Sequence, residues 1–241
     1  MKAEIEKHCQ ALRLCQQRPG RLLSVVDLIE RETLSLKTAA FLLEVISGGS
    51  SFIVGARPGG AGKTTVMVSL LNFIPPGMEI IPTDEPRKLD ANFYSKPTCF
   101  LCHEIGPGPY YAYLWGDSLL SFFRLKKQGH LLSSNVHADT LEEARKQICE
   151  LNQVPISLFH QIELYLFLRV EESGKRILET AWYSLVPGKH RLVIAKGDLV
   201  RDWPEKEKRL RAHQDFLKLL LASGIRQLEA VRAAVVDYLK T

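Results

Sequence analysis

A glycine-rich segment between an apolar run and a helical pattern constrains this chain more than any other feature. The apolar run 51–54 precedes it, and the pattern over 66–73 follows it. Glycines allow backbone N–H groups to turn toward an anion, which would also face the positive end of the helix. The sequence therefore predicts a strand, a phosphate-binding loop and a helix. The loop reads Gly55-Ala56-Arg57-Pro58-Gly59-Gly60-Ala61-Gly62-Lys63-Thr64-Thr65.

The second half of this loop carries the residues that we expect to bind a nucleotide: Gly59, Gly60, Ala61, Gly62, Lys63, Thr64 and Thr65. Lys63 would place a point charge beside the β- and γ-phosphates, and the Thr64 hydroxyl would coordinate Mg²⁺. Without a phosphate, we expect Lys63 to be solvated. The alternative is an ordinary strand–helix turn with a chance Lys-Thr pair, which the context on both sides disfavours.

The composition is that of a globular protein with material for a core. The 241 residues are 46% hydrophobic and 24% charged, enough for one α/β domain with an appendage or two small domains. The formal charge of +5 suits an anionic partner such as a nucleotide or a lipid surface. Without a basic stripe suited to a duplex, no specific nucleic acid is expected. No apolar run approaches a membrane-spanning length, and the N-terminus has no secretory h-region.

The five cysteines are scattered along the chain. Cys99 and Cys102 have C-x-x-C spacing, but no second pair follows and their setting is an apolar strand. In such a strand, Cys99 and Leu101 should face one way, and Phe100 and Cys102 the other. We therefore expect buried structural thiols, with a metal or redox site as the alternative. A reducing cytosol fits this usage.

Alternating helices and strands along the chain predict an α/β fold with a mainly parallel sheet and helices on both faces. Ser35 and Thr140 are the expected N-caps of two helices, the second with Glu143 in a capping box. The segments are 1–50 (helical), 51–170 (nucleotide-binding core) and 171–241 (a β-hairpin and helices). The expected helices are 3–17 (ended by residues 18–20), 24–29, 35–47, 66–73, 117–127, 141–151, 204–221 and 227–239; the strands are 51–54, 79–81, 98–102, 131–135, 162–170, 177–185 and 190–195.

Polar residues fall where the predicted strands end, which is where ligands bind in parallel sheets. Glu104 is placed to orient or deprotonate an attacking water, or to support Mg²⁺ through water. Asp84 and Glu85 could serve the metal shell, and His137 could contact a γ-phosphate. Asn135 ends the same strand as His137. The alternative is that these carboxylates lie in solvent and the histidine is hydrogen-bonded structure.

Taken in order, these motifs resemble the RecA-like secretion motor ATPases of type II and type IV secretion, type IV pili, tight-adherence pili and archaella. The resemblance covers roughly residues 24–170 and extends more weakly to the C-terminal helices. The segments that carry it are Leu28-Ile29-Glu30-Arg31-Glu32-Thr33-Leu34-Ser35, the phosphate loop, Phe73-Ile74-Pro75-Pro76, Asp84-Glu85-Pro86, His103-Glu104, Gly129-His130 and Asn135-Val136-His137-Ala138.

The resemblance implies a RecA-like P-loop NTPase core that binds ATP and Mg²⁺. By that likeness Lys63 and Thr64 are the Walker A pair, and Asp84 and Glu85 belong to the acidic Asp box. Glu104 is then the catalytic Walker B glutamate, and His137 the His box histidine. Members of this family form hexameric rings and drive pilus assembly or export at the cytoplasmic face of the membrane. A membrane platform or a pilus or secretion protein is accordingly an expected partner.

Several residues depart from the family pattern. Arg57 replaces the first Walker glycine, and Lys88 falls where the Asp box often ends in an acid. The Walker B arginine is missing, since the chain reads His103-Glu104-Ile105-Gly106. The interval between Asp84 and Glu104 looks too short for the usual helix, residues 107–111 look like an insertion, and the N-terminal domain is reduced to residues 1–50.

These departures predict slow turnover and a monomer or weak oligomer in isolation. A positive group is still needed opposite the γ-phosphate, and the candidates near the loop and the Asp box are Arg57, Arg87 and Lys88, of which Arg57 and Arg87 are expected to face solvent. The leading hypothesis is an ATP hydrolase. The alternatives are a catalytically degenerate nucleotide-binding subunit and, on weaker grounds, a P-loop kinase or a nucleic-acid ATPase.

Overall fold

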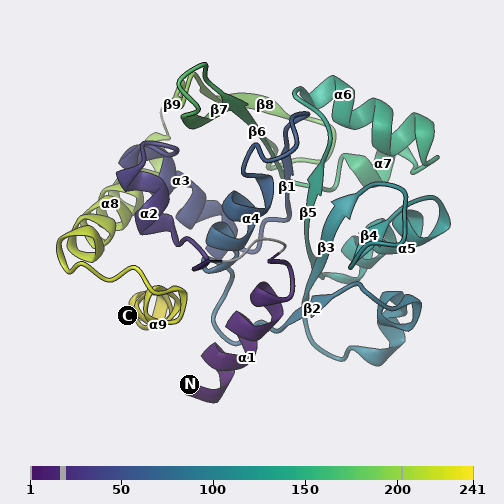
Figure 1. Cartoon of the computed structure of the whole chain (residues 1–241), viewed down its shortest axis with the longest axis horizontal. Helices are drawn as coiled ribbons and strands as arrows, with labels where there is room; N and C mark the ends of the chain where they lie inside the picture. Colours follow the sequence, from purple (N-terminus) through teal and green to yellow (C-terminus); the bar gives the residue numbers. More distant parts are fainter. Residues whose placement is uncertain (1, 17–19, 202, 241) are drawn as a thin grey trace.

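One mixed sheet organises the molecule, as the α/β prediction requires (Figure 1). The computed structural model describes residues 2–16, 20–201 and 203–240. Within them the strand order is β2-β3-β5-β1-β6-β7-β8-β9, with β2 to β6 parallel and β7 to β9 antiparallel. The strands are β1 (Phe52–Gly55), β2 (Ile80–Pro82), β3 (Cys99–Ile105), β4 (Tyr113–Leu114, paired with β3), β5 (Leu131–Val136), β6 (Leu164–Val170), β7 (Arg176–Tyr183), β8 (Arg191–Ala195) and β9 (Asp198–Leu199).

Helices cover both faces of this sheet, which confirms the predicted layering (Figure 1). The helices on one face are α1 (Lys2–Arg13), α2 (Val25–Glu30), α3 (Leu36–Ser47), α4 (Lys63–Leu71), α8 (Glu207–Ala222) and α9 (Leu228–Lys240). Those on the other face are α5 (Asp117–Leu125), α6 (Leu141–Arg145) and α7 (Ile156–Phe159). The strands β7 to β9, from the segment 171–241, continue the sheet of the core.

The alternation of side chains along β3 follows the sequence pattern. Cys99 and Leu101 belong to the apolar core on the α4 side, and Phe100 and Cys102 to the core on the α5 side. Both thiols are free and completely buried. Burial raises the pKa of the Cys102 thiol to about 12, so it stays protonated and unreactive. The predicted buried structural thiols are confirmed.

The two predicted N-caps form, although the capping box is incomplete. Ser35 Oγ accepts the Thr38 N–H at 3.1 Å, and Thr140 Oγ1 accepts the Glu143 N–H at 3.2 Å. The Glu143 carboxylate does not return to the N–H of Thr140, because it accepts the N–H of Asp139 instead. The capping box expected here is therefore half formed.

Several elements differ from the sequence expectation. The helix predicted over 141–151 is α6 followed by a π-helical turn, η4 (Lys146–Leu151). The strand β3 continues to Ile105 because β4 and β5 pair with its last residues. The strands β4 and β9 and the helix α7 were not predicted. One expectation about the connection from β2 to β3 is met. The interval between Asp84 and Glu104 holds only two 3₁₀ turns among its described elements, η1 (Pro86–Leu89) and η2 (Ala91–Phe93), and no longer helix. The helix α1 ends at Arg13, and residues 17–19 lie outside the described residues.

A buried polar cluster joins α1, α4 and α9. Arg232 donates to the carbonyls of Asn72, Ile74 and Pro75 at 2.8, 2.6 and 3.1 Å, which satisfies carbonyls left unpaired where α4 ends. His8 Nε2 lies 3.1 Å from Asn72 Oδ1. Burial, together with the nearby Arg232 charge, lowers the pKa of His8 to about 3. His8 is therefore neutral in the folded protein near neutral pH.

This cluster predicts a specific pH dependence of stability. The folded pKa of His8 is about 3 and its unfolded value 6.5, so the unfolded chain binds more protons between these values. The contribution of His8 to the free energy of unfolding is therefore fully present above pH 6.5. It decreases as the pH falls toward 3, by at most about 1.4 kcal/mol per pH unit. The variant His8→Gln, which does not titrate, should show a shallower slope of unfolding free energy between pH 6 and pH 4 in urea titrations. Equal slopes in both proteins would contradict the prediction.

Candidate nucleotide-binding site

The carboxyl ends of β1, β3 and β5 meet at one edge of the sheet. Gly55 on β1 and Ile105 on β3 both pair in register with Val136 on β5. Glu104 and His137 are each one residue away from this level, so the strand register brings them to the start of the phosphate loop. Asn135 lies on β5 directly before Val136. The structure thus gathers three of the polar residues that the sequence placed at strand ends.

Two glycines shape the loop where other residues would not fit. A Cβ on Gly55 would lie 2.5 Å from the Ala138 carbonyl oxygen and 2.6 Å from the Phe167 ring. Gly62, with φ of +96°, precedes the first residue of α4 in the left-handed region that favours glycine. The Ala61 N–H donates to the Pro58 carbonyl at 3.2 Å. The loop is therefore a tight turn that ends at the N-terminus of a helix.

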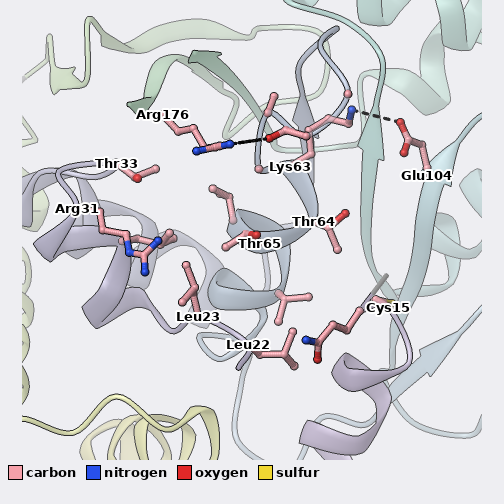
Figure 2. A pocket seen from close by; sticks show the side chains of 18 of the residues that line it. Cys15, Leu22, Leu23, Arg31, Thr33, Lys63, Thr64, Thr65, Glu104 and Arg176 are labelled. Atoms are coloured by element: carbon pink, nitrogen blue, oxygen red, sulfur yellow. Dashed lines mark hydrogen bonds and ion pairs between the residues drawn. The ribbon is translucent and has the colours of Figure 1, made fainter. Parts of the chain in front are cut away.

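Lys63 is buried and paired in the ligand-free structure. Its Nζ donates to the Ala56 carbonyl at 3.1 Å and lies 3.4 Å from Glu104 Oε1 (Figure 2). Only 7% of the Lys63 side chain and 8% of the Glu104 side chain are exposed. The expectation that Lys63 would be solvated without a phosphate was wrong, because the loop folds back over it and Glu104 supplies the opposite charge.

Three side chains surround the Glu104 carboxylate, and Tyr113 is the one that forms a hydrogen bond with it among the described residues, since the buried Oε1 has none. Its Oε1 lies 2.6 Å from His137 Nε2 as well as near Lys63, and its Oε2 accepts the Tyr113 hydroxyl at 3.0 Å. The other nitrogen of His137, Nδ1, lies 3.2 Å from the carbonyl oxygen of Arg57. His137 thereby connects the acid on β3 to the start of the phosphate loop. A carboxylate in such a setting can accept a proton once one of its partners moves away.

Thr64 lies in a polar pocket beside this acid. Its Oγ1 lies 3.3 Å from His103 Nε2 and accepts from Asn135 Nδ2 at 3.3 Å. Burial lowers the pKa of His103, which favours the neutral ring. Asn135 Oδ1 is a buried acceptor that lacks a hydrogen bond among the described residues. A hydroxyl beside an unused amide oxygen fits a Mg²⁺ ion that retains its water ligands.

A cavity of about 740 Å³ opens in front of the loop (Figure 2). The loop residues 59–65 form one wall, and Leu22, Leu23 and Leu28 form part of an apolar wall. Glu104 carries the only carboxylate among the described residues that line the cavity. The lysines and arginines that line it are Arg21, Arg31, Lys63, Lys175 and Arg176. Arg21 and Lys175 pair with Asp27 and Glu32, which lie outside the lining, so positive side chains face the cavity and their acids do not. The size and this lining suit a nucleotide rather than a neutral ligand.

Asp84 and Glu85 lie outside the lining of this cavity. Lys88 Nζ pairs with Asp84 Oδ1 at 2.5 Å, and Arg87 Nε pairs with Glu85 Oε2 at 2.6 Å. The described part of the chain contains no group of three or more His, Cys, Asp and Glu side chains that could hold a metal ion. A role of Asp84 and Glu85 in the metal shell stays a prediction.

The positive groups that the sequence proposed opposite the γ-phosphate do not line the cavity either. Arg57 Nη2 pairs with Glu143 Oε1 at 2.5 Å, and its side chain is 61% exposed. Arg87 and Lys88 pair with the acids described above. The arginines that do line the cavity, Arg21, Arg31 and Arg176, were not proposed for this role from the sequence. The expectation that Arg57 and Arg87 face solvent is confirmed, and a role of any of the three opposite the γ-phosphate stays a prediction.

The roles of His103, Tyr113 and Arg176 were also missed. His103 had a detectable signal, since it immediately precedes Glu104 near a strand end. Tyr113 reaches Glu104 only because the loop after β3 returns to form β4. Arg176 reaches the loop only because β7 follows β6 through a tight turn. Neither of these two residues carries a local sequence signal for its contact.

No family model matches the sequence, and no curated protein matches it. Solved structures similar to the chain include the VirB11 ATPase from the Brucella suis type IV secretion system in complex with sulphate (22% identity, 64% of this chain and 55% of that chain, TM-score 0.47). A second is the ATPase DotB of Legionella pneumophila (12% identity, 83% of this chain and 55% of that chain, TM-score 0.42). A third is the ATPase DotB of Yersinia pseudotuberculosis (12% identity, 91% of this chain and 64% of that chain, TM-score 0.47). The chain spans between about half and two thirds of their length.

The buried pair of Lys63 and Glu104 predicts an effect on the ligand-free protein. Lys63→Ala should lower the unfolding free energy by about 1–3 kcal/mol, because it leaves a buried carboxylate that keeps only His137 and Tyr113. Urea denaturation in nucleotide-free buffer measures this. The control Lys127→Ala removes an exposed lysine from the surface and should change stability by less than about 0.5 kcal/mol. Equal stability of Lys63→Ala and wild type would show that the pair contributes nothing.

Proposed function

We propose that this chain binds Mg²⁺–ATP in the cavity and hydrolyses it, as an ATPase that resembles the secretion and pilus motors. The observation that carries the proposal is the arrangement of Lys63, Glu104 and His137 beside the glycine-rich loop. Lys63, the first residue of α4, and His137 both lie within ion-pair distance of the buried Glu104 carboxylate. This combination is what phosphoryl transfer to water needs.

The loop supplies the phosphate site. Backbone N–H groups of residues 59–65 and the positive end of α4 would surround the β- and γ-phosphates. Lys63 would leave the Ala56 carbonyl and Glu104 to pair with phosphate oxygens, since a charge-assisted bond to phosphate is stronger than one to a carbonyl. Binding of the nucleotide would thereby free the carboxylate.

Thr64 and Asn135 would hold the metal side of the substrate. The Thr64 hydroxyl would coordinate Mg²⁺, and the unused Asn135 Oδ1 would accept from one of its water ligands. When bound, Mg²⁺ supplies neutralisation of the charge on the phosphate oxygens. His103, kept neutral by burial, adds no positive charge beside the metal.

Glu104 would act as the general base. Once Lys63 has turned to the phosphates, Glu104 would accept a proton from water as the water oxygen bonds to the γ-phosphorus. The bond from that phosphorus to the bridging oxygen of ADP would break in the same step. Tyr113 and His137 would keep the carboxylate aimed at the water.

The setting in the cell is likewise a proposal, which rests on the family resemblance of the sequence motifs. We place this activity in the cytoplasm, at the inner face of the membrane, where a ring of subunits would engage a membrane platform or a pilus or secretion protein. A nucleotide-binding partner subunit without turnover is the second candidate. The presence of Arg57 in the loop favours this second reading, because the pattern has a glycine at that position.

Nucleotide should stabilise the protein. Mg²⁺–ATP at about one hundred times its Kd should add roughly 2.7 kcal/mol to the unfolding free energy. Lys63→Ala should lose most of this gain, over and above its effect without ligand. Thermal unfolding with and without Mg²⁺–ATP measures both. An unchanged melting temperature of the wild type in saturating Mg²⁺–ATP would refute nucleotide binding.

Removal of the proposed base should separate binding from turnover. Glu104→Gln should bind Mg²⁺–ATP but release phosphate about 10²- to 10⁴-fold more slowly than wild type, since the amide cannot accept the proton. His137→Ala should reduce turnover less. The control Glu6→Gln changes an exposed glutamate on α1 and should have wild-type turnover. Equal phosphate release by wild type and Glu104→Gln would show that Glu104 is not the base, and no release by either protein would favour the partner subunit.

A further inference from the structure

The hairpin of β6 and β7 brings an arginine to the phosphate loop. Arg176, the first residue of β7, donates from Nε and Nη2 to the Gly60 carbonyl at 3.2 and 3.1 Å (Figure 2). Its Nη1 donates to the Gly174 carbonyl at 3.2 Å. Gly60 is a central residue of the predicted phosphate site, so the guanidinium lies directly against it.

The charge of Arg176 is not neutralised by an acid. Among the described residues its acceptors are backbone carbonyls, and no ion pair to a carboxylate is found. The other arginines near the loop and the Asp box differ in this respect, since Arg57 pairs with Glu143 and Arg87 with Glu85. A guanidinium with neutral acceptors in a positively charged cavity gains more from an anion than one that already has a carboxylate.

Arg176 lies on the opposite side of Lys63 from Glu104 (Figure 2). Its Cδ is 3.1 Å from the position that a Cβ on Gly62 would occupy, so the stem of the side chain packs against the loop. A phosphate held by the loop would therefore have Lys63 and Arg176 as nearby positive charges. This is the geometry that stabilises charge on a transferring phosphoryl group.

The hairpin is held in place independently of any ligand. Lys175 pairs with Glu32, and the Leu178 N–H donates to the Thr33 carbonyl at 3.0 Å. Both contacts fix the start of β7 to the connection between α2 and α3. Arg176 is therefore presented to the loop by a strand whose start has its own contacts elsewhere. Such preorganisation keeps the cost of its engagement low.

We propose that Arg176, supplied by the same chain, exchanges the Gly60 carbonyl for the terminal phosphate of bound ATP and thereby distinguishes ATP from ADP. This inference rests on the proposed function, because it needs a nucleotide in the cavity. It assigns to β7 a positive group beside the phosphates, whereas Arg57, Arg87 and Lys88 pair with acids and do not line the cavity. The bidentate fork of arginine suits the phosphate oxygens better than a lysine would.

The test compares two nucleotides and three variants. Calorimetry measures the Kd of Mg²⁺–ADP and of a non-hydrolysable Mg²⁺–ATP analogue for wild type, Arg176→Ala, Arg176→Lys and the control Arg169→Ala. Arg169 lies on β6 of the same hairpin, pairs with Glu179 and does not line the cavity. Thermal unfolding of each ligand-free variant checks that it is folded.

Arg176→Ala should weaken binding of the ATP analogue roughly ten- to hundredfold and leave ADP binding within about threefold, the loss expected for a charge-assisted contact. Arg176→Lys should restore part of the difference, and Arg169→Ala should match wild type. Equal weakening for both nucleotides would show that Arg176 only supports the loop. No weakening for either nucleotide would show that Arg176 has no role in binding. Each of these two results would overturn the inference and leave the proposed function standing. Failure of the wild type to bind either nucleotide would overturn the proposed function and the inference with it.

Discussion

The burial of the Lys63 ammonium is the constraint on which the rest of the site depends. A buried charge without partners is strongly unfavourable, so its position requires an opposite charge and a hydrogen-bond acceptor close by. Glu104 and the Ala56 carbonyl meet this requirement. Glu104 in turn is buried, accepts a hydrogen bond from Tyr113 and has His137 within ion-pair distance. One lysine thus links β1, β3, β4 and β5 through a chain of polar contacts.

The parallel strands make this chain of contacts short. Because β1, β3 and β5 are adjacent and run in the same direction, residues far apart in the sequence end at one edge. The apolar cores on the two faces hold the strands in this register, since a shift by one residue would exchange the faces of Cys99 and Phe100. The chemistry of the edge therefore depends on packing well away from it.

The sequence predicted those parts of the structure that local pattern determines. The loop, the alternation along β3 and the gathering of Glu104 and His137 follow from periodicity, glycine spacing and the rule for strand ends. The burial of Lys63 was not predicted, because it depends on how the loop folds back without a ligand. Arg176 and Tyr113 were missed because their contacts depend on a hairpin register and on the return of a loop. The pairing of Asp84 with Lys88 was not predicted, because Asp84 precedes the 3₁₀ turn η1 and its contact depends on the path of the loop.

The hydrogen bond between the Ala61 N–H and the Pro58 carbonyl has a consequence for affinity. Together with the contacts of Lys63 and Arg176, it means that groups able to receive a phosphate already have partners within the protein. A ligand must displace these internal partners, so a measured dissociation constant reports the difference between two sets of contacts. The fraction of molecules with an open loop scales the apparent affinity. Weakening an internal partner would therefore tighten binding without any new contact to the ligand.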